Sequence, residues 1–216
     1  MPDFARQRRT MVDGQLRTYD VTHAGLLAAF GAVPREVFVN PAQQPVAYVD
    51  QPQPLGGDRA LPAPMVLARL IQAAEIKPDD RVLEVGCGTG YGAAILTALG
   101  ASVVALESDP ELADRARACL AAAGSAATVV TGPLPDGWAA LGPFDAIVMN
   151  GCFEKEPTRL LAQLGDRGRL VGIRGVGRSA RAMLYRRAGG HSSGRQVFDA
   201  AAPSLPGFEA VLAFSF

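Results

Sequence analysis

Short apolar runs alternate with amphipathic stretches over the central part of the chain, and this alternation predicts the fold. Five apolar runs predict strands, at 81–85, 103–107, 127–131, 144–149 and 168–173. Three stretches with helical spacing of alanine and leucine predict helices, at 91–99, 110–123 and 157–164. Strands that alternate with helices in this way indicate an α/β fold, with a mostly parallel sheet covered on both faces.

The tail of the chain predicts two more strands. The runs at 182–186 and 210–216 have strand character, and a glycine-rich loop separates them. They bring the predicted sheet to seven strands.

The first 76 residues predict a helical extension before the sheet. Thr22 can cap one helix, and Pro64 is well placed to begin another over 64–74. The segment 40–64 has six prolines and little periodicity, and it is too long for an ordinary connection. We expect it to lie across a site as a lid. We therefore divide the chain into 1–76, the extension with its lid and substrate loop, and 77–216, the sheet domain, within one folding unit.

The most informative chemistry lies at the first strand-to-helix turn, which reads RVLEVGCGTGYG. Gly86, Gly88 and Gly90 follow the strand directly, and Glu107 ends the next strand. Glycine lets the backbone approach a ligand where a Cβ atom would clash. An acid at the end of the next strand can accept hydrogen bonds from two ribose hydroxyls. The turn therefore predicts a nucleoside site.

Two cofactor classes use this layout. Gly88, Gly90 and Ala93 satisfy the dinucleotide spacing, in which a pyrophosphate lies at the helix N-terminus. The denser G-x-G-x-G form favours S-adenosylmethionine instead, and so does Glu84, two residues before the first glycine. A carboxylate there would attract a sulfonium and an α-ammonium group, whereas it has little use beside a pyrophosphate. A glycine-rich turn that binds no ligand is the third interpretation.

Composition restricts the classes of function. The 216 residues are 49% hydrophobic and 19% charged, which is typical of a globular domain with a substantial core. A formal net charge of zero argues against a nucleic-acid partner. Three scattered cysteines and two histidines predict neither a disulfide framework nor a metal site. We find no signal peptide and no apolar run of membrane-spanning length, so we expect a soluble cytoplasmic protein with no membrane partner.

A stretch from Arg167 to Arg195 holds eight arginines and no acidic residue. It is either a surface for an anionic partner or a solvated strand pair and loop. The neutral overall charge favours the second interpretation.

Several segments of the chain resemble protein-L-isoaspartate O-methyltransferases, and together they extend from Met11 to Gly175. They read MVDGQLR, AVPREVFV, AYVDQPQPLG, VLEVGCGTGYGAAIL, GPFDAIV and LLAQLGDRGRLV. Members of this family transfer a methyl group from S-adenosylmethionine to the free α-carboxylate of isoaspartyl residues in damaged proteins. The ester then closes to a succinimide, which can reopen to aspartate. The resemblance implies a Rossmann-like methyltransferase fold and an acceptor that is a protein, peptide or small-molecule carboxylate.

The resemblance also implies which residues bind the cofactor. Glu84 and the loop glycines would line the methionine portion, and Glu107 would hold the ribose. The full predicted set is Glu84, Gly86, Cys87, Gly88, Gly90, Glu107, Ser108, Pro133 and Leu134.

Two departures from the family pattern affect the predicted activity. Ala60 and Pro62, which flank Leu61, stand where the family has a Thr and a Ser, and neither side chain can donate a hydrogen bond. After the third strand, Pro133 and Leu134 replace the Asp-Gly of a Gly-Asp-Gly turn. We therefore assign no catalytic residue. Isoaspartyl methylation, methylation of another acceptor, and a cofactor-binding interaction protein with little or no turnover all remain open.

Overall fold

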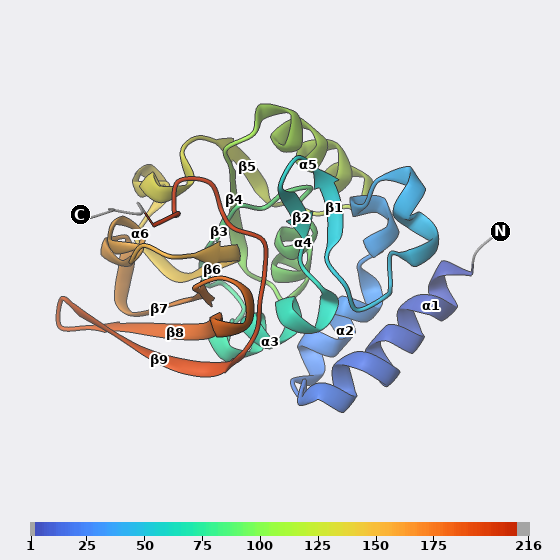
Figure 1. The fold of residues 1–216 in the computed structure, drawn as a ribbon, viewed down its shortest axis with the longest axis horizontal. Helices are drawn as coiled ribbons and strands as arrows, with labels where there is room; N and C mark the ends of the chain where they lie inside the picture. The colour runs from blue at the N-terminus through green and yellow to red at the C-terminus, as the bar shows by residue number, and fades with distance from the viewer. Residues whose placement is uncertain (1–2, 211–216) are drawn as a thin grey trace, which may run out of the picture.

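Seven strands form a single twisted sheet in the order β5-β4-β3-β6-β7-β8-β9 (Figure 1). The structure is a computed structural model, and it describes residues 3–210. The strands are β3 (Arg81–Val85), β4 (Ser102–Glu107), β5 (Thr128–Thr131), β6 (Phe144–Phe153), β7 (Leu164–Arg174), β8 (Arg181–Ala188) and β9 (His191–Asp199). The first five strands in this order run parallel, and β8 and β9 are antiparallel to their neighbours. The predicted α/β class with a seven-stranded, mostly parallel sheet is confirmed.

Both faces of the sheet are covered. Successive residues of a strand point to opposite faces, so Val82 belongs to one apolar cluster and Leu83 to the other. The first cluster is completed by α3 (Pro64–Ala74), α4 (Tyr91–Ala98) and α5 (Pro110–Ala122). The second is completed by the short α6 (Thr158–Ala162) and by loops that follow β5 and β9. The strand order reverses between β3 and β6, and in parallel sheets ligands bind beyond the strand ends at such a point.

The N-terminal extension begins with α1 (Phe4–Met11), continues through irregular helical turns, and leads into α2 (Ala24–Ala32) at the end of the molecule opposite β9 (Figure 1). The prediction that Thr22 caps α2 is wrong. His23 is the N-cap, and its Nδ1 accepts a hydrogen bond from the Leu26 amide at 3.0 Å. The Thr22 amide instead donates to Gln72 Oε1 at 2.8 Å, which places the chain so that α2 begins one residue later.

The proline-rich segment holds a small antiparallel hairpin of β1 (Gln53–Gly56) and β2 (Arg59–Leu61). Gly56 ends β1 and Gly57 begins the turn, with φ of 130° and 51°, values that favour glycine. Arg115 of α5 donates to the Leu55 carbonyl at 3.0 Å and so ties the hairpin to the sheet domain. Its role as a lid stays a prediction.

The predictions were wrong at two strands of the sheet, the edge strand β9 and the central strand β6. Residues 191–199, predicted as a glycine-rich loop, form the edge strand β9, because a largely exposed edge strand can be polar and still pair with β8. The strand predicted at 144–149 continues to Phe153, so Asn150 lies in a strand and not in a loop. The candidate strand 210–216 lies outside the described residues, apart from Ala210, which is not in a strand.

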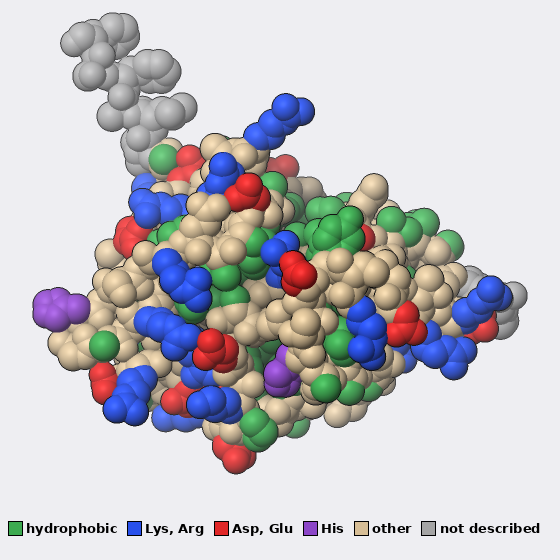
Figure 2. Space-filling model, turned by 90° about the horizontal axis from the view of Figure 1, so that it is seen from below, with side chains coloured by type: hydrophobic (Ala, Val, Ile, Leu, Met, Phe, Trp, Pro, Cys, Tyr) green, Lys and Arg blue, Asp and Glu red, His purple; other side chains and the backbone are tan. Residues whose placement is uncertain are grey.

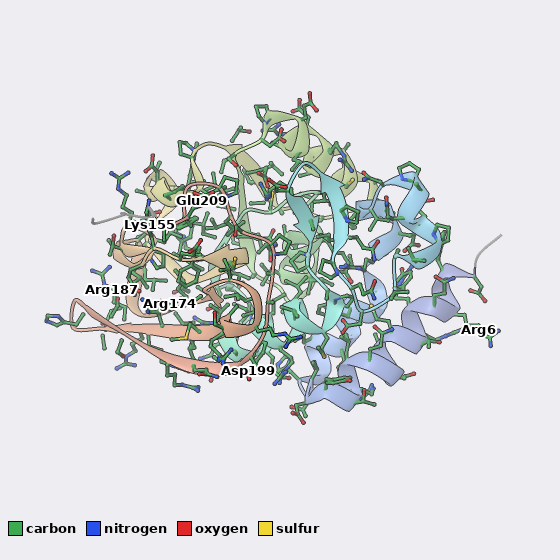
Figure 3. The ribbon with its side chains drawn as sticks, in the orientation of Figure 1. Arg6, Lys155, Arg174, Arg187, Asp199 and Glu209 are labelled. Carbon is green, nitrogen blue, oxygen red and sulfur yellow. The ribbon has the colours of Figure 1, made fainter. Side chains whose placement is uncertain are left out.

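The arginine-rich stretch is extensively paired with acids from elsewhere in the chain. The pairs are Arg169–Asp80, Arg174–Glu156, Arg181–Asp199 and Arg186–Glu75. Arg174 and Arg187 lie at the end of the molecule opposite Arg6 (Figure 3), and on the face seen in Figure 2 positive and negative side chains are interspersed. These pairs favour the solvated strand pair over an anion-binding surface.

Among residues 3–210, no helix is long and apolar enough to cross a membrane.

Candidate cofactor and acceptor site

The glycine loop between β3 and α4 has the backbone geometry that its sequence predicts. Gly86, Gly88 and Gly90 all have positive φ, at 74°, 58° and 91°. Residues other than glycine rarely adopt positive φ without strain, so the turn itself requires the three glycines. Cys87 between them is fully buried, and burial raises the pKa of its thiol well above the usual value. The thiol is therefore a packing group in the loop and not a reactive thiolate.

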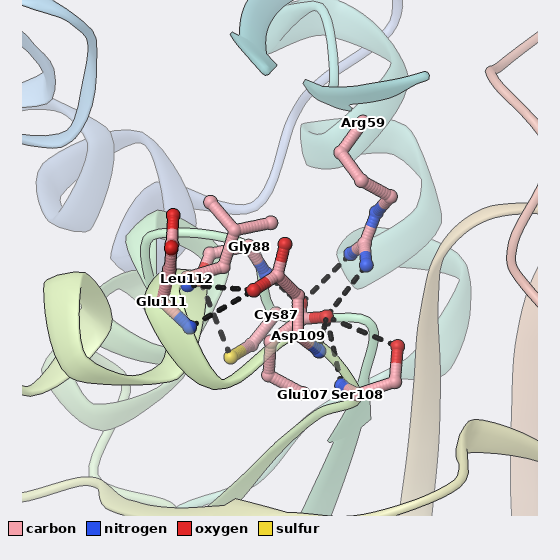
Figure 4. Close-up of polar contacts among 8 residues, drawn as sticks. All are labelled: Arg59, Cys87, Gly88, Glu107, Ser108, Asp109, Glu111 and Leu112. Carbon is pink, nitrogen blue, oxygen red and sulfur yellow. Dashed lines mark hydrogen bonds and ion pairs between the residues drawn. The ribbon is translucent and has the colours of Figure 1, made fainter. Parts of the chain in front are cut away.

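Glu107 ends β4 beside this loop, and its carboxylate is completely buried. Three backbone N–H groups hold it: Gly88 donates to Oε2 at 2.8 Å, while Ser108 and Asp109 donate to Oε1 at 2.8 and 3.2 Å (Figure 4). Backbone donors of this kind fix the plane of the carboxylate. Both oxygens are thereby fixed in position beside the glycine loop.

Arg59 of β2 meets these two oxygens with a forked guanidinium (Figure 4). Its Nη1 donates to Glu107 Oε1 at 2.5 Å and its Nη2 to Oε2 at 2.8 Å. Only 11% of the Arg59 side chain is exposed, so this is a mostly buried ion pair. Arg59 is not among the predicted site residues, although it directly precedes Ala60, Leu61 and Pro62. These three residues are called the acceptor loop below.

Glu84, on β3, is also fully buried, against the first turn of α4. Asn150 donates to its Oε1, and its Oε2 has no hydrogen-bond partner among the described residues. A Cβ atom on Gly92 would lie 1.9 Å from Glu84 Oε1, so a larger residue at that helical position requires the Glu84 side chain to move. Burial raises the pKa of Glu84 to about 8, and the hydrogen bonds from Asn150 and the Ala93 amide only partly oppose this shift.

Apolar side chains from two loops lie over Gly86. A Cβ atom built on Gly86 would be 2.5 Å from Leu205 Cδ2 and 3.6 Å from Leu134 Cδ1. Leu205 is held there because its segment pairs with β6: Cys152 donates to the Pro203 carbonyl at 2.8 Å and accepts from the Leu205 amide at 2.9 Å. The segment that follows β9 therefore belongs to the wall of the site.

The turn after β5 places the buried side chain of Leu134 over Gly86, and Pro133 directly precedes it. Asp136 does not replace the missing acid of this turn. Its carboxylate forms an ion pair with Arg159 at the surface, since the short helical turn after Pro133 points it away from Gly86.

The acceptor loop is held in place by its strand pairing and by a hydrogen bond from a buried arginine. Ala60 pairs within the β1–β2 hairpin, Leu61 is buried, and the Pro62 carbonyl accepts from Arg35 Nη2 at 2.7 Å. Arg35 is completely buried and lies 4.8 Å from the ring centroid of Tyr91, the first residue of α4. The loop is thus fixed to the glycine loop through the backbone of Pro62, independently of the side chain there.

The structure brings nearly all the predicted site residues to the carboxyl ends of β3, β4 and β5. Four residues that contact the predicted site residues are not in the predicted set, namely Arg59, Gly92, Asn150 and Leu205. Gly92 carried a signal, because it is a glycine inside a helical pattern directly after the turn. Leu205 carried none, since its position depends on where the chain returns after β9.

The sheet order, the glycine loop and the acids at the ends of β3 and β4 together define a class. The protein has the Rossmann-like α/β fold of S-adenosylmethionine-dependent methyltransferases.

Comparison with known proteins gives the particular family. Residues 6–200 match the family described as protein-L-isoaspartate(D-aspartate) O-methyltransferase. The chain is 43% identical over 171 residues to the protein-L-isoaspartate O-methyltransferase of Methylorubrum extorquens (strain PA1), covering 79% of this chain and 75% of that one. This chain therefore belongs to the protein-L-isoaspartate O-methyltransferase family, as its motifs predicted.

Solved structures support the fold. A protein-L-isoaspartate O-methyltransferase matches with a TM-score of 0.80 at 22% identity, covering 93% of this chain and 66% of the other. A Plasmodium falciparum relative, solved in complex with S-adenosyl-L-homocysteine, matches with a TM-score of 0.79 at 18% identity, covering 95% and 99%.

Proposed function

We propose that this chain is an S-adenosylmethionine-dependent O-methyltransferase that acts on isoaspartyl carboxylates of damaged proteins or on a closely related carboxylate. The observation that carries the proposal is the buried carboxylate of Glu107, held by three amides with both oxygens directed at a pair of donors. A ribose presents two neighbouring hydroxyl donors of the same kind. Membership of the family and a relative solved with S-adenosyl-L-homocysteine support the same cofactor.

The residues around Glu84 fit the rest of such a cofactor. Glu84 Oε2 is a buried acceptor without a partner in the described chain, beside glycines that leave the backbone bare. When bound, S-adenosylmethionine supplies an electrophilic methyl group on a sulfonium. We propose that the cofactor contacts are those predicted from the sequence: Glu84, Gly86, Cys87, Gly88, Gly90, Glu107, Ser108, Pro133 and Leu134.

The acceptor side can act without a general base. A carboxylate is already ionised near neutral pH, so the protein needs only to align an oxygen with the methyl group and keep water out. Leu61, Leu134 and Leu205 supply buried apolar surface at this edge of the sheet. Ala60 and Pro62 add no side-chain donor, and the orientation of the acceptor then depends on shape and backbone groups.

We propose the same division of labour along the chain as the sequence suggested. Residues 1–76 supply the acceptor side and the lid, while residues 77–216 supply the cofactor side, within one folding unit. The proposed partner is a protein or peptide carboxylate in the cytoplasm, with a small-molecule carboxylate as the alternative and with neither nucleic acid nor membrane involved.

The test is transfer of label from methyl-labelled S-adenosylmethionine to an isoaspartyl peptide. A peptide of the same sequence with normal aspartate is the matched control. We expect base-labile label on the isoaspartyl peptide alone, and none with the Glu107→Ala variant. Binding of S-adenosylhomocysteine without transfer to the isoaspartyl peptide would contradict the assigned acceptor, and failure to bind it would contradict the cofactor.

A further inference from the structure

The position of Arg59 has a consequence for cofactor binding. Its guanidinium occupies both oxygens of Glu107, the same atoms to which the proposed function assigns the two ribose hydroxyls. We propose that Arg59 is an internal competitor of the cofactor, held on Glu107 by the β1–β2 hairpin and expelled when the ribose binds. This inference rests on the proposed function and adds a residue that sets cofactor affinity.

The hydrogen bonds of Glu107 show why the two cannot coexist. Oε1 accepts from the amides of Ser108 and Asp109, from Arg59 and, at 3.4 Å, from the Ser108 hydroxyl, while Oε2 accepts from the Gly88 amide and from Arg59. A carboxylate offers about four lone-pair sites, so these six donors leave none free. The three amides belong to the turn itself and cannot leave without unfolding it. Among these donors the guanidinium is the only group that covers both oxygens and can leave without unfolding the turn.

The mimicry is also geometric. A guanidinium presents two parallel N–H donors to a carboxylate, and a ribose presents two adjacent O–H donors to the same pair of oxygens. Arg59 Nη2 further lies 3.4 Å from the position that a Cβ atom would take on Gly86, so the group lies over the glycine loop as well as on Glu107.

The hairpin that carries Arg59 is packed on the loop at a second point. A Cβ atom on Gly88 would be 2.7 Å from Leu55 Cδ1, so β1 lies directly against the backbone there. Arg115 and Asn40 hold the far side of β1 through the carbonyls of Leu55 and Pro54. Expelling Arg59 therefore disturbs a fixed hairpin, and the strand that carries it continues directly into Ala60 and Pro62.

This connection links the two halves of the site. Arg59, Ala60 and Leu61 are consecutive residues of β2, and Pro62 follows directly. When the cofactor displaces Arg59, the backbone of the acceptor loop therefore shifts as well. A ligand shifts such an equilibrium only by its preference for one state, so part of its binding free energy is spent on releasing Arg59. The affinity of the native chain is lowered accordingly.

The experiment is calorimetric titration of S-adenosylhomocysteine into the native chain and three variants. In Arg59→Gln the side chain loses its charge and the paired N–H donors of the guanidinium. We expect S-adenosylhomocysteine to bind this variant about tenfold more tightly. In Arg59→Lys a single ammonium cannot match the fork, and we expect an intermediate affinity. Arg17→Gln is the matched control, since Arg17 lies exposed in the N-terminal extension and pairs with Asp13, and the affinity of this variant should equal that of the native chain.

The outcomes separate this inference from the proposed function. Equal or weaker binding by the folded Arg59→Gln and Arg59→Lys variants, with measurable binding by the native chain, overturns the competitor role alone. Absence of binding by all four proteins overturns the proposed cofactor and this inference with it. If Arg59→Gln does not fold, Arg59→Lys decides, because it keeps the charge beside Glu107.

Discussion

The cofactor side of the site and the acceptor loop are held together by different kinds of contact. Backbone amides fix the carboxylate of Glu107, and glycines shape the loop beside it. The acceptor loop is fixed by two long side chains instead, Arg35 below Pro62 and Arg59 at the start of β2. The first arrangement depends on the fold of the turn, and the second depends on individual side chains.

The two regions also differ in how far they keep the family pattern. Glu84, the glycine loop and Glu107 are all present, whereas Ala60 and Pro62 stand where the resemblance places hydroxyl groups. The residues of the first region are constrained by a cofactor common to the family. The residues of the second region are constrained only by the acceptor molecule. Since a carboxylate nucleophile needs no base, the acceptor loop can change its side chains while methyl transfer remains chemically feasible.

Removing the central carboxylate should abolish cofactor binding. Glu107→Ala deletes the acceptor of both ribose hydroxyls, and we expect the affinity for S-adenosylhomocysteine to fall by about a hundredfold or more, or about 3 kcal/mol. Calorimetry measures it. Glu111→Ala, on the exposed first turn of α5, is the control and should bind normally. A Glu107→Ala variant with native affinity would show that the cofactor does not use this carboxylate.

The contact between Glu84 and α4 predicts a large effect of a single methyl group. Gly92→Ala places a Cβ atom where Glu84 Oε1 lies, and we expect the free energy of unfolding to fall by about 2 kcal/mol. Gly31→Ala in α2 is the matched control. No atom lies within 4 Å of its added Cβ, so it should gain about 0.5 kcal/mol from helix propensity. Urea unfolding measures the free energy of unfolding of both variants. If the change is the same for Gly92→Ala as for Gly31→Ala, the Glu84 side chain moves aside without cost.

The sequence predicted the geometry of the glycine loop and the place of Glu107 beside it because the signals for both are local. Glycines at a strand-to-helix turn and an acid at the end of the next strand are required by backbone geometry, and the structure places them together. The helix beginning at Pro64 was predicted to the residue for a similar reason, since proline favours the first helical position.

The parts that were missed depend on contacts between distant segments. Arg59 meets Glu107 across 48 positions of sequence, and Leu205 reaches Gly86 only because its segment pairs with β6. Neither contact leaves a periodic pattern. The edge strand β9 was missed because its exposed polar residues hide the alternation on which strand prediction depends.

Burial of Glu84 predicts a pH dependence of the free energy of unfolding. The pKa of Glu84 is raised to about 8 in the folded protein from a usual value of 4.5, so the folded state keeps a proton that the unfolded chain loses between these values. Stability therefore falls as pH rises through this window, by up to about 1.4 kcal/mol per unit. Glu84→Gln should flatten the slope in urea unfolding at a series of pH values. If the slope is unchanged in Glu84→Gln, the pH dependence of stability comes from other groups. Glu111→Gln is the control and should keep the slope of the native chain.

Restoring the hydroxyls of the acceptor loop should sharpen the contrast between the two regions. In Ala60→Thr/Pro62→Ser the loop regains two side-chain donors, and Arg35 can still bond to the carbonyl at position 62 because that contact uses only the backbone. We expect kcat/KM for an isoaspartyl peptide to rise about tenfold, or about 1.4 kcal/mol, with unchanged affinity for S-adenosylhomocysteine.

Ala63→Ser is the control for that variant, because it adds a hydroxyl to the same loop one residue beyond the altered positions. An equal rise in the control would mean that any added hydroxyl suffices. If kcat/KM does not rise in the double variant while cofactor binding is intact, the loop is shaped for a different carboxylate. The two regions would then be specialised separately, with the cofactor side common to the family and the acceptor side particular to this chain.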